Sequence, residues 1–267
     1  MRQGQVGIND AKVQLIFLIA RVLRKKTKKM KYTDFEYVLS TERMGRYLQA
    51  CGGDSRKAMT LYRYNLQLSQ EMFTVISCFE VALRNAIDRH MRPRFGNDWL
   101  RDSILPNGIF QTNANFIGTT RIIDKAYQKL VQDHSYTHTQ LLTAMEFGVW
   151  KYMFSTLQYR ATGQSLLQVF PNKQRSTPQM QINQAYIYNE LDKVNKLRNR
   201  IAHHETICFV PPTIAPNTSY IINEYQKIQT LFMWMGIDSR SLLYGLDHVQ
   251  QVCSKINSPK NKNSGVS

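Results

Sequence analysis

The chain has 267 residues, 35 of them basic and 19 acidic, which gives a net charge of +16 with 43% hydrophobic residues. This length suits one large domain or two small ones, and the apolar content excludes a chain that is disordered throughout. The four cysteines have no paired spacing (Cys51, Cys78, Cys208 and Cys253), so neither a zinc site nor a secreted disulfide framework is expected. We therefore expect a cytoplasmic protein with reduced thiols and without a metal or other cofactor.

The positive charge is concentrated at the two ends of the chain. Residues 1–31 carry nine basic residues and one acidic residue, and the last thirteen residues carry three more lysines. Residues 32–254 keep a net charge of only +5. Three parts are expected: a basic amphipathic extension over 1–31, a helical domain over 32–254, and a basic, disordered tail over 255–267. The charge invites RNA or anionic lipid as a partner.

The N-terminal extension contains an apolar stretch at residues 11–23 that is interrupted by Lys12, Gln14 and Arg21. A membrane-spanning helix needs roughly 20 apolar residues, so stable membrane insertion is not expected. A signal peptide is also not indicated, because the basic run follows the apolar stretch. Three interpretations stay open: a membrane-surface helix, a basic RNA-binding arm, or sequence upstream of a true start at Met30.

Helical punctuation begins near residue 40. Ser40 and Thr41 predict a helix start, and Gly52-Gly53 predicts the helix end. Asp54 or Ser55 should cap a further helix through Tyr62. Residues 66–91 show apolar residues at spacings of three and four, which predicts a long core helix. That stripe comprises Leu68, Met72, Val75, Phe79, Ala82 and Ala86, thickened by Phe73, Ile76, Ile87 and Met91.

The second half of the chain continues in the same way. Prolines and glycines predict an irregular connection over 92–111 and a polar surface loop over 161–181. Helices are expected over about 114–133, 138–160, 182–204, 218–234 and 239–255. His134 and His138 are expected in loops or on the surface. Because no alternating strand pattern of useful length is present, the predicted fold class is all-α, a multi-helix bundle with irregular connecting loops.

The helix predicted over 182–204 carries the chemically informative residues. Arg198 lies within its apolar stripe, where a guanidinium that cannot lose its proton needs an acid, backbone acceptors or a bound phosphate. Asn199 and His203 are four residues apart on one flank, so the amide can orient the imidazole. Arg198 and His203 are about 140° apart on a straight helix, so a common phosphate requires arginine's reach, a bend, or a second copy of the helix. The plain alternative is a helix C-terminus with cations against its dipole.

This segment resembles a known family. Arg198-Asn199-Arg200-Ile201-Ala202-His203-His204-Glu205 is similar to the Arg-(Asn/Asp/His)-x3-His signature of the HEPN superfamily, in the form found in bacterial Abi-like (abortive infection) proteins. Further segments agree with it in order: 42–48, the Gly-Gly-Asp turn at 52–54, 58–62 with Asn65, Leu68-Ser69 and 79–85. The resemblance covers roughly residues 32–235. Thr206 stands where proline is expected, which should affect the chain exit more than the chemistry.

The resemblance implies a HEPN-like helical bundle and a homodimeric, metal-independent endoribonuclease of abortive-infection or toxin–antitoxin-type phage defence. By position, His203 would be the general base or acid at the ribose 2′-hydroxyl and the leaving oxygen. Arg198 would hold the scissile phosphate, and Asn199 would orient His203. Such cleavage leaves a 2′,3′-cyclic phosphate, so DNA should be inert.

Residues around the motif are expected to support it. Glu80, with Glu205 as the less favoured choice, is predicted to supply the acid facing Arg198, and Arg84 lies four residues after Glu80 on the same helix. The alternative is a plain ion pair between Glu80 and Arg84. His204 and Glu205 stand beside the motif, but adjacent residues on different faces without a third ligand do not indicate a metal site. The series Arg84, Asn85 and His90 repeats the signature with one extra residue, and a second catalytic motif there is not favoured.

RNA contact is expected from basic residues beside the motif and in the polar loop, although such residues often form solvated faces. They are Lys193, Lys196 and Arg200, together with Lys173 and Arg175. Two other functions stay open: a non-catalytic RNA-binding or regulatory HEPN module, and a helical scaffold or membrane-surface effector. An antitoxin or a regulatory RNA is a further expected partner.

Overall fold

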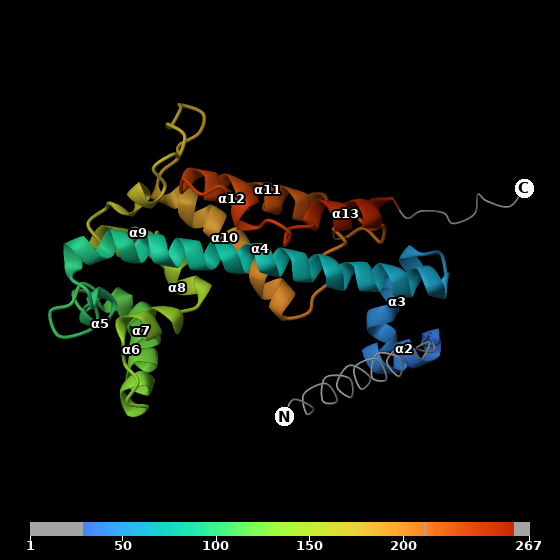
Figure 1. The fold of residues 1–267 in the computed structure, drawn as a ribbon, viewed down its shortest axis with the longest axis horizontal. Helices are drawn as coiled ribbons and strands as arrows, with labels where there is room; N and C mark the ends of the chain where they lie inside the picture. Colours follow the sequence, from blue (N-terminus) through green and yellow to red (C-terminus); the bar gives the residue numbers. More distant parts are fainter. Residues whose placement is uncertain (1–28, 211, 259–267) are drawn as a thin grey trace, which may run out of the picture. The chain divides into compact units, whose positions relative to one another are not determined.

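The computed structural model describes residues 29–210 and 212–258. Over these residues the chain forms twelve α-helices and two short 3-10 helices, without a strand (Figure 1). Phe209 and Pro216 form an isolated antiparallel bridge. The predicted all-α fold class is confirmed. The apolar stretch of the N-terminal extension and the tail from residue 259 lie outside the described residues.

The chain divides into two compact units, residues 1–59 and 60–267. In the first unit, helix α2 (Tyr32–Leu39) packs against α3 (Thr41–Ala50). The side chain of Ser40 accepts a hydrogen bond from the amide of Arg43 at 3.2 Å, which caps α3 as the sequence predicts. The glycines that follow α3 have φ of 60° and 83°, the left-handed backbone that glycine adopts without strain.

Helix α4 (Ser55–Phe95) is a single helix of 41 residues. The predicted break between two helices was wrong, and the predicted irregular connection begins after residue 95 and not at residue 92. No glycine or proline interrupts residues 55–92, so the helix continues through the polar positions between the two predicted pieces. Asp54 caps its start by accepting hydrogen bonds from the amides of Arg56 and Lys57, both at 3.0 Å. Gly96, with φ of 92°, follows its end.

The core of the second unit is built around α4. In Figure 1, α4 runs across the view between α5–α8 on one side and α11–α13 on the other. The ring of Phe79 contacts Phe147 at 6.3 Å and Phe232 at 5.2 Å, measured between centroids. Most of the predicted apolar stripe of α4 is buried, but Phe73 is 44% exposed and does not belong to the core.

The stretch predicted as one helix over 138–160 forms three short helices. They are α7 (His138–Thr143), α8 (Phe147–Tyr152) and α9 (Thr156–Ala161). The backbone is extended at Glu146 and at Ser155, which separates them. These breaks allow the aromatic side chains of Phe147, Trp150 and Phe154 all to be buried. The predicted helical structure is confirmed within each short helix, but the prediction of one continuous helix over 138–160 was wrong.

The remaining elements follow the predicted order with local differences. Helix α5 (Trp99–Asp102) lies within the predicted irregular connection, and η1 (Ala114–Phe116) with α6 (Ile117–Gln132) fills the helix predicted over 114–133. Within the predicted surface loop, η2 (Leu166–Val169) buries Leu166 and Val169. Helices α10 (Gln184–Ala202) and α11 (Ser219–Trp234) confirm the predicted helices, whereas the last one is divided into α12 (Ser239–Leu242) and α13 (Val249–Asn257).

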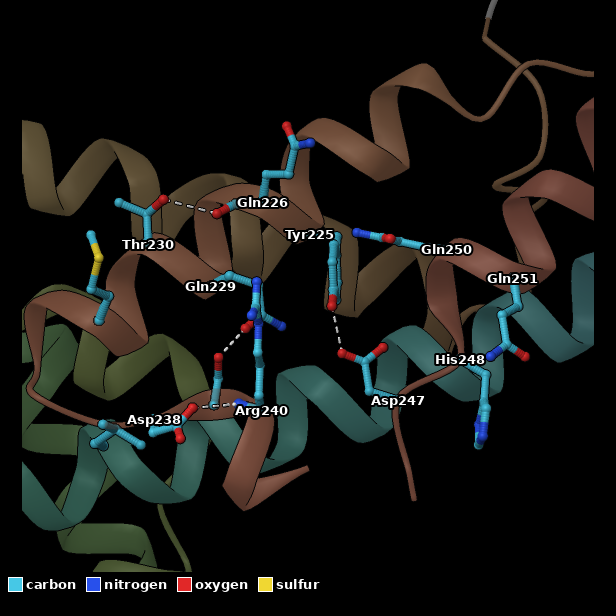
Figure 2. Close-up of a pocket in the computed structure, with 13 residues that line it drawn as sticks. Tyr225, Gln226, Gln229, Thr230, Asp238, Arg240, Asp247, His248, Gln250 and Gln251 are labelled. Atoms are coloured by element: carbon cyan, nitrogen blue, oxygen red, sulfur yellow. Dashed lines mark hydrogen bonds between the residues drawn. The ribbon is translucent and has the colours of Figure 1, made fainter. Parts of the chain in front are cut away.

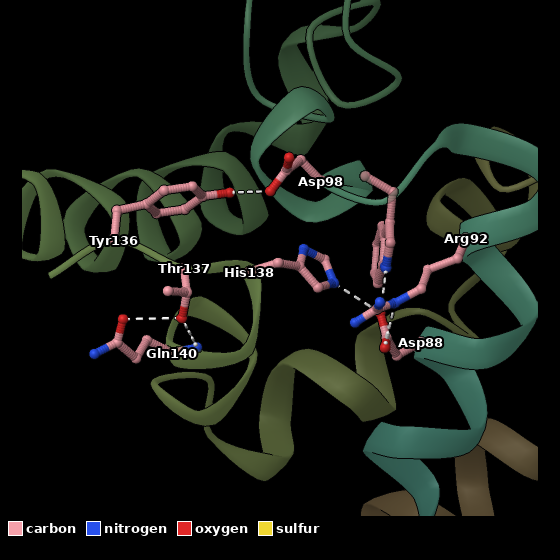
Figure 3. Close-up of polar contacts among 8 residues, drawn as sticks. Asp88, Arg92, Asp98, Tyr136, Thr137, His138 and Gln140 are labelled. Atoms are coloured by element: carbon pink, nitrogen blue, oxygen red, sulfur yellow. Dashed lines mark hydrogen bonds and ion pairs between the residues drawn. The ribbon is translucent and has the colours of Figure 1, made fainter.

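A buried polar cluster joins α4 to α5 and α7 (Figure 3). Asp88 is only 7% exposed and accepts hydrogen bonds from Trp99 Nε1 at 2.9 Å, Arg92 Nε at 2.8 Å and His138 Nε2 at 2.7 Å. Burial alone would raise the pKa of Asp88, but the hydrogen bonds from His138 and Trp99 and the neighbouring charges lower it overall. The expectation that His138 lies in a loop or on the surface was wrong, because this cluster buries it. His134 is exposed as expected.

Candidate functional site

The predicted motif occupies the last turn of α10 and the chain that leaves it. Asn183 caps the start of α10, where its side chain accepts a hydrogen bond from the amide of Tyr186 at 3.0 Å. Five apolar residues form the buried face: Ile187, Leu191, Val194, Leu197 and Ile201. Through this face α10 packs against α8, α9 and α11. The amphipathic pattern therefore positions Arg198 at the boundary between core and solvent.

The end of α10 places His203 at the surface. The amide of His203 bonds to the carbonyl of Asn199 at 2.9 Å, and the amide of Glu205 bonds to the carbonyl of Arg200 at 2.9 Å. His204 between them has φ of 57°, so the helix closes in a Schellman-type turn with a histidine where glycine is usual. His203 is the last residue before the chain turns, and its side chain is exposed.

A residue of α4 fixes the chain beyond this turn. The side-chain oxygen of Asn65, which is 3% exposed, accepts hydrogen bonds from the amides of Ile207 at 2.9 Å and Cys208 at 3.1 Å. The amide of Ile207 would otherwise be buried without a partner, so this contact helps to determine where the segment after the motif runs. Asn65 lies 142 and 143 positions before these two residues in the sequence. The contact gives a structural reason for the presence of Asn65 together with the motif.

Two arginines from different helices have buried donor groups without a hydrogen-bond partner. Arg198 on α10 and Arg84 on α4 both act electrostatically on Glu80, and both have a buried Nε without a hydrogen-bond partner. Within the described part of the chain, no carboxylate lies within 4.0 Å of either guanidinium. Each arginine therefore retains donor groups that an oxyanion could occupy.

The ionisation of Glu80 is affected by residues of three elements: α4, α10 and the start of α8. Burial raises the pKa of Glu80 above its ordinary value, and the lowering effect of Arg198 and Arg84 does not fully offset it. The negative charge of Glu146 also raises the pKa of Glu80. Glu146 was not predicted from the sequence. It lies 66 positions after Glu80 and 52 positions before Arg198, and no local pattern connects it to either residue.

The other residues of the motif make different contacts. The side-chain oxygen of Asn199 accepts a hydrogen bond from Arg198 Nη1 at 3.4 Å, so a role for Asn199 in orienting His203 remains a prediction. Glu205 pairs with Arg200 at 3.1 Å, and Arg200 also donates to the carbonyl of Thr206 at 3.0 Å. Arg200 therefore links the end of α10 to the segment that leaves it. That Glu80 supplies the acid facing Arg198 stays a prediction.

The predicted RNA-binding residues fall into two groups. Lys193 pairs with Glu190 at 2.6 Å and Lys196 with Asp192 at 2.8 Å, so these two lysines, like Arg200, stand beside acidic side chains. Lys173 and Arg175 lie in the polar segment after η2, away from the motif in sequence. The apparent repeat of the signature on α4 directs His90 elsewhere, with Nε2 at 2.8 Å from the Ser165 hydroxyl.

A pocket lies at a different place, among α11, α12 and α13 (Figure 2). It has a volume of about 880 Å³, and its polar wall includes Tyr225, whose hydroxyl donates to Asp247 at 2.5 Å. None of the predicted site residues lines it. Over residues 29–210 and 212–258, no three His, Cys, Asp or Glu side chains are grouped as metal ligands, and no helix is both long and apolar enough to cross a membrane.

Comparison with known proteins identifies the family. Residues 25–208 match the family model described as Abi-like protein, and this span is more than half of the chain. It includes α3, the whole of α4 with Asn65 and Glu80, and the whole motif at the end of α10. No curated protein and no solved structure matches the sequence. The extent of the family match shows that the chain belongs to the Abi-like protein family.

Proposed function

We propose that the chain is a metal-independent endoribonuclease of the HEPN type, acting in abortive-infection or toxin–antitoxin-type phage defence. Membership of the Abi-like family suggests an abortive-infection-type function. The similarity of residues 198–205 to the HEPN signature supports RNA cleavage as the activity. The proposal places the protein in the cytoplasm, with an antitoxin or a regulatory RNA as the partner that restrains it.

The observation that carries the proposal is the buried Nε of Arg84 and of Arg198, neither of which has a hydrogen-bond partner. Both arginines are partly buried and without a carboxylate within 4.0 Å among the described residues. A planar guanidinium matches two oxygens of a phosphate, and buried cations need such a partner. A phosphodiester of RNA would supply the oxyanion that this arrangement lacks.

In the proposed reaction Arg198 holds the scissile phosphate and stabilises the charge that grows on its oxygens. His203 transfers a proton at the ribose 2′-hydroxyl or at the leaving oxygen, since imidazole titrates near neutrality. The 2′-oxygen attacks phosphorus and the bond to the 5′-oxygen breaks. The products are a 2′,3′-cyclic phosphate and a 5′-hydroxyl, so DNA is not a substrate.

A homodimer is part of the proposal. His203 is exposed beyond the end of α10, about 140° around the helix from Arg198. A second copy related by a two-fold axis would bring Arg198 of one subunit toward His203 of the other. Lys173 and Arg175 would bind phosphates of the RNA. Lys193, Lys196 and Arg200 would also bind phosphates once their ion pairs with acidic neighbours are broken.

One contact favours a second function, a non-catalytic RNA-binding or regulatory module. The side-chain oxygen of Asn199 accepts a hydrogen bond from Arg198. This contact does not connect Arg198, the proposed phosphate-binding residue, to His203 within one chain. Such a protein would hold RNA through its arginines and leave it intact. Retention of uncleaved RNA by the purified protein would identify this function.

Induced expression in bacteria tests the proposed cellular role. Wild-type protein should arrest growth, and Arg198→Ala and His203→Ala should abolish the arrest at equal protein levels. Arg160→Ala and His134→Asn, which change exposed residues away from the motif, should still arrest growth. Equal arrest by wild type and both motif variants would contradict the proposal.

A further inference from the structure

A pair of tyrosines lies where α8 packs against α10, toward the end of α10 that is opposite the motif. Tyr152 is the last residue of α8, and Tyr188 lies in the second turn of α10. Their ring centroids are 6.1 Å apart, and the ring planes are tilted by 53°. Tyr152 is 43% exposed, and Tyr188 is half-buried. A large part of Tyr152 is therefore open to solvent.

A buried lysine holds this tyrosine pair in place. The Nζ of Lys151 lies 4.5 Å from the ring centroid of Tyr152 and 5.3 Å from that of Tyr188. Its third contact is the carboxylate of Asp192 on α10, at 2.8 Å. Because Lys151 is only 5% exposed, its charge needs these three partners, and the contacts fix the two rings relative to each other. The tyrosine pair is thus pre-organised by contacts within the chain.

A second lysine adds positive charge beside the tyrosine pair. Lys196 also contacts Asp192 at 2.8 Å, and its side chain is 71% exposed. Asp192 therefore faces two ammonium groups, and the cluster keeps a net charge of +1. Lys196 can leave Asp192 for a phosphate, because Lys151 still neutralises that carboxylate. An exposed aromatic ring beside a positive charge suits single-stranded nucleic acid, whose bases stack on the ring while the cation binds a phosphate.

One side of α10 connects the tyrosine pair to the motif. Its members recur at spacings of four, four, three and four residues, which places them on the same side of the helix: Tyr188, Asp192, Lys196, Asn199 and His203. The last three of them are exposed. Tyr188 and His203 are about 22 Å apart along the helix axis. That distance corresponds to roughly six stacked nucleotides, so one strand can reach both ends of this side.

We propose that the Tyr152–Tyr188 pair is a stacking subsite for an unpaired base of the RNA strand whose phosphate lies at the motif. The inference rests on the proposed action on RNA and adds the form of the substrate, which is single-stranded at this subsite. A base inside a duplex is stacked on both sides and offers no free face to Tyr152, so duplex RNA does not enter the subsite. Lys196 binds a phosphate beside the stacked base.

Binding of a strand that cannot be cleaved tests the subsite independently of catalysis. The probe is a fluorescent oligomer of about twelve 2′-O-methyladenosines, long enough to span the side of α10 and without a free 2′-hydroxyl. Its affinity for the full-length protein is measured by fluorescence anisotropy. Tyr152→Ala should weaken binding by about 5- to 100-fold, because the stacked base loses its ring. Tyr152→Phe keeps the ring and should bind within about twofold of wild type.

Two further variants separate stacking from general attraction to the strand. The matched control is Tyr244→Ala, which removes a tyrosine that is 89% exposed and lies outside α8 and α10, and it should bind as wild type does. Lys196→Ala should reduce the slope of log affinity against log salt concentration by about 0.7, as the loss of one phosphate contact does. Tyr152→Ala should keep the wild-type slope. Annealing the probe to a complementary strand should abolish the difference between wild type and Tyr152→Ala.

Three results would overturn the inference. Wild type that does not bind the probe, or Tyr152→Ala that binds it within about twofold of wild type, would exclude a stacking subsite. A change of Tyr152→Ala from dimer to monomer in light scattering would place the tyrosine pair in a subunit interface. Should Tyr152→Ala not fold, Tyr152→Leu keeps an apolar side chain without the aromatic ring, and wild-type affinity in this variant would equally exclude stacking.

The outcomes also separate this inference from the proposed function. If wild type cleaves total RNA and Tyr152→Ala binds the probe as wild type does, only the inference fails. If wild type leaves total RNA intact while Tyr152→Ala loses affinity for the probe, the ribonuclease function fails and the stacking subsite stands.

Discussion

Arg198 is the residue on which the proposed chemistry depends most directly. Its guanidinium lies at the edge of the buried face of α10, with Nε buried and without a hydrogen-bond partner. A lysine at this position would keep the charge and lose the planar pair of donors. We expect Arg198→Lys to cleave RNA about 100-fold more slowly than wild type.

The matched control for this substitution is Arg160→Lys, at an exposed position on α9. Initial cleavage rates and the melting temperature should be measured for both variants. We expect both to melt as wild type does, and only Arg198→Lys to be slow. A wild-type cleavage rate in Arg198→Lys would show that the site needs a positive charge and not a planar pair of hydrogen-bond donors.

Asp88 makes a pH-dependent contribution to stability. Its pKa is lowered in the folded protein, so its ionised form stabilises the fold above the ordinary carboxyl pKa of about 4. That stabilisation is lost as the pH falls through the lowered pKa. The difference in unfolding free energy between wild type and Asp88→Asn should therefore shrink from pH 7 toward pH 3.

Denaturant unfolding at a series of pH values measures this difference. The control is Asp124→Asn, an exposed aspartate on α6, which should give a small difference from wild type at every pH. A large Asp88→Asn effect that stays constant down to pH 3 would contradict the role assigned to the charge on Asp88.

At the level of single residues, periodicity and composition were enough to predict some positions and not others. The buried face of α10 and the position of Arg198 within it are determined by a spacing of three and four. The effect of Glu146 on the pKa of Glu80 depends on the tertiary fold, and no local pattern contains it. For the same reason His138 was placed wrongly, since its burial depends on Asp88, 50 residues earlier.

At the level of elements, α4 contributes residues to the candidate site and also fixes the segment that follows the motif. It carries Glu80 and Arg84, and its Asn65 fixes the chain that leaves α10. Replacing Asn65 with alanine would leave the amide of Ile207 buried without its acceptor. We expect Asn65→Ala to lower the free energy of unfolding by about 2 kcal/mol or more.

Denaturant unfolding compares this variant with Gln67→Ala, which changes a half-buried amide on the same helix. Asn65→Ala should also cleave RNA more slowly, because His203 lies just before the loosened segment. Equal stability of the two variants would mean that the amides find other partners.

The helices differed from prediction where periodicity does not determine continuity. The 41-residue α4 was divided in the prediction because polar residues interrupt its stripe, although no helix-breaking residue does. The reverse happened over 138–160, where a continuous pattern forms three helices separated at Glu146 and Ser155. Over 138–160 the breaks accompany the burial of Phe147, Trp150 and Phe154.

At the level of the whole molecule, the proposed homodimer can be tested by mixing inactive variants. Arg198→Ala and His203→Ala should each be inactive alone. If a site combines Arg198 of one subunit with His203 of the other, each mixed dimer contains one intact site. Equal mixing with subunit exchange should then restore about a quarter of wild-type activity.

Light scattering should first establish the size of the particle. A dimer that regains no activity on mixing would place both residues of a working site in the same subunit. A monomer that cleaves RNA would contradict the homodimer itself.

The net charge of +16 contributes less to the proposed function than its size suggests. Residues 1–31 hold +8 of it, and most of that extension lies outside the described residues. Three basic residues beside the motif stand next to acids. The case for RNA cleavage rests on Arg84, Arg198 and His203 and on the family, with charge as a minor support.

The most direct test of RNA cleavage is the chemistry of the cut ends. Purified protein should be incubated with total RNA in EDTA, and the 3′ ends of the fragments analysed. Wild type should give fragments ending in 2′,3′-cyclic phosphate, whereas Arg198→Ala and His203→Ala should give none, and DNA should stay intact. Intact RNA retained by all three proteins, or equal cleavage by all three, would contradict the proposed ribonuclease function.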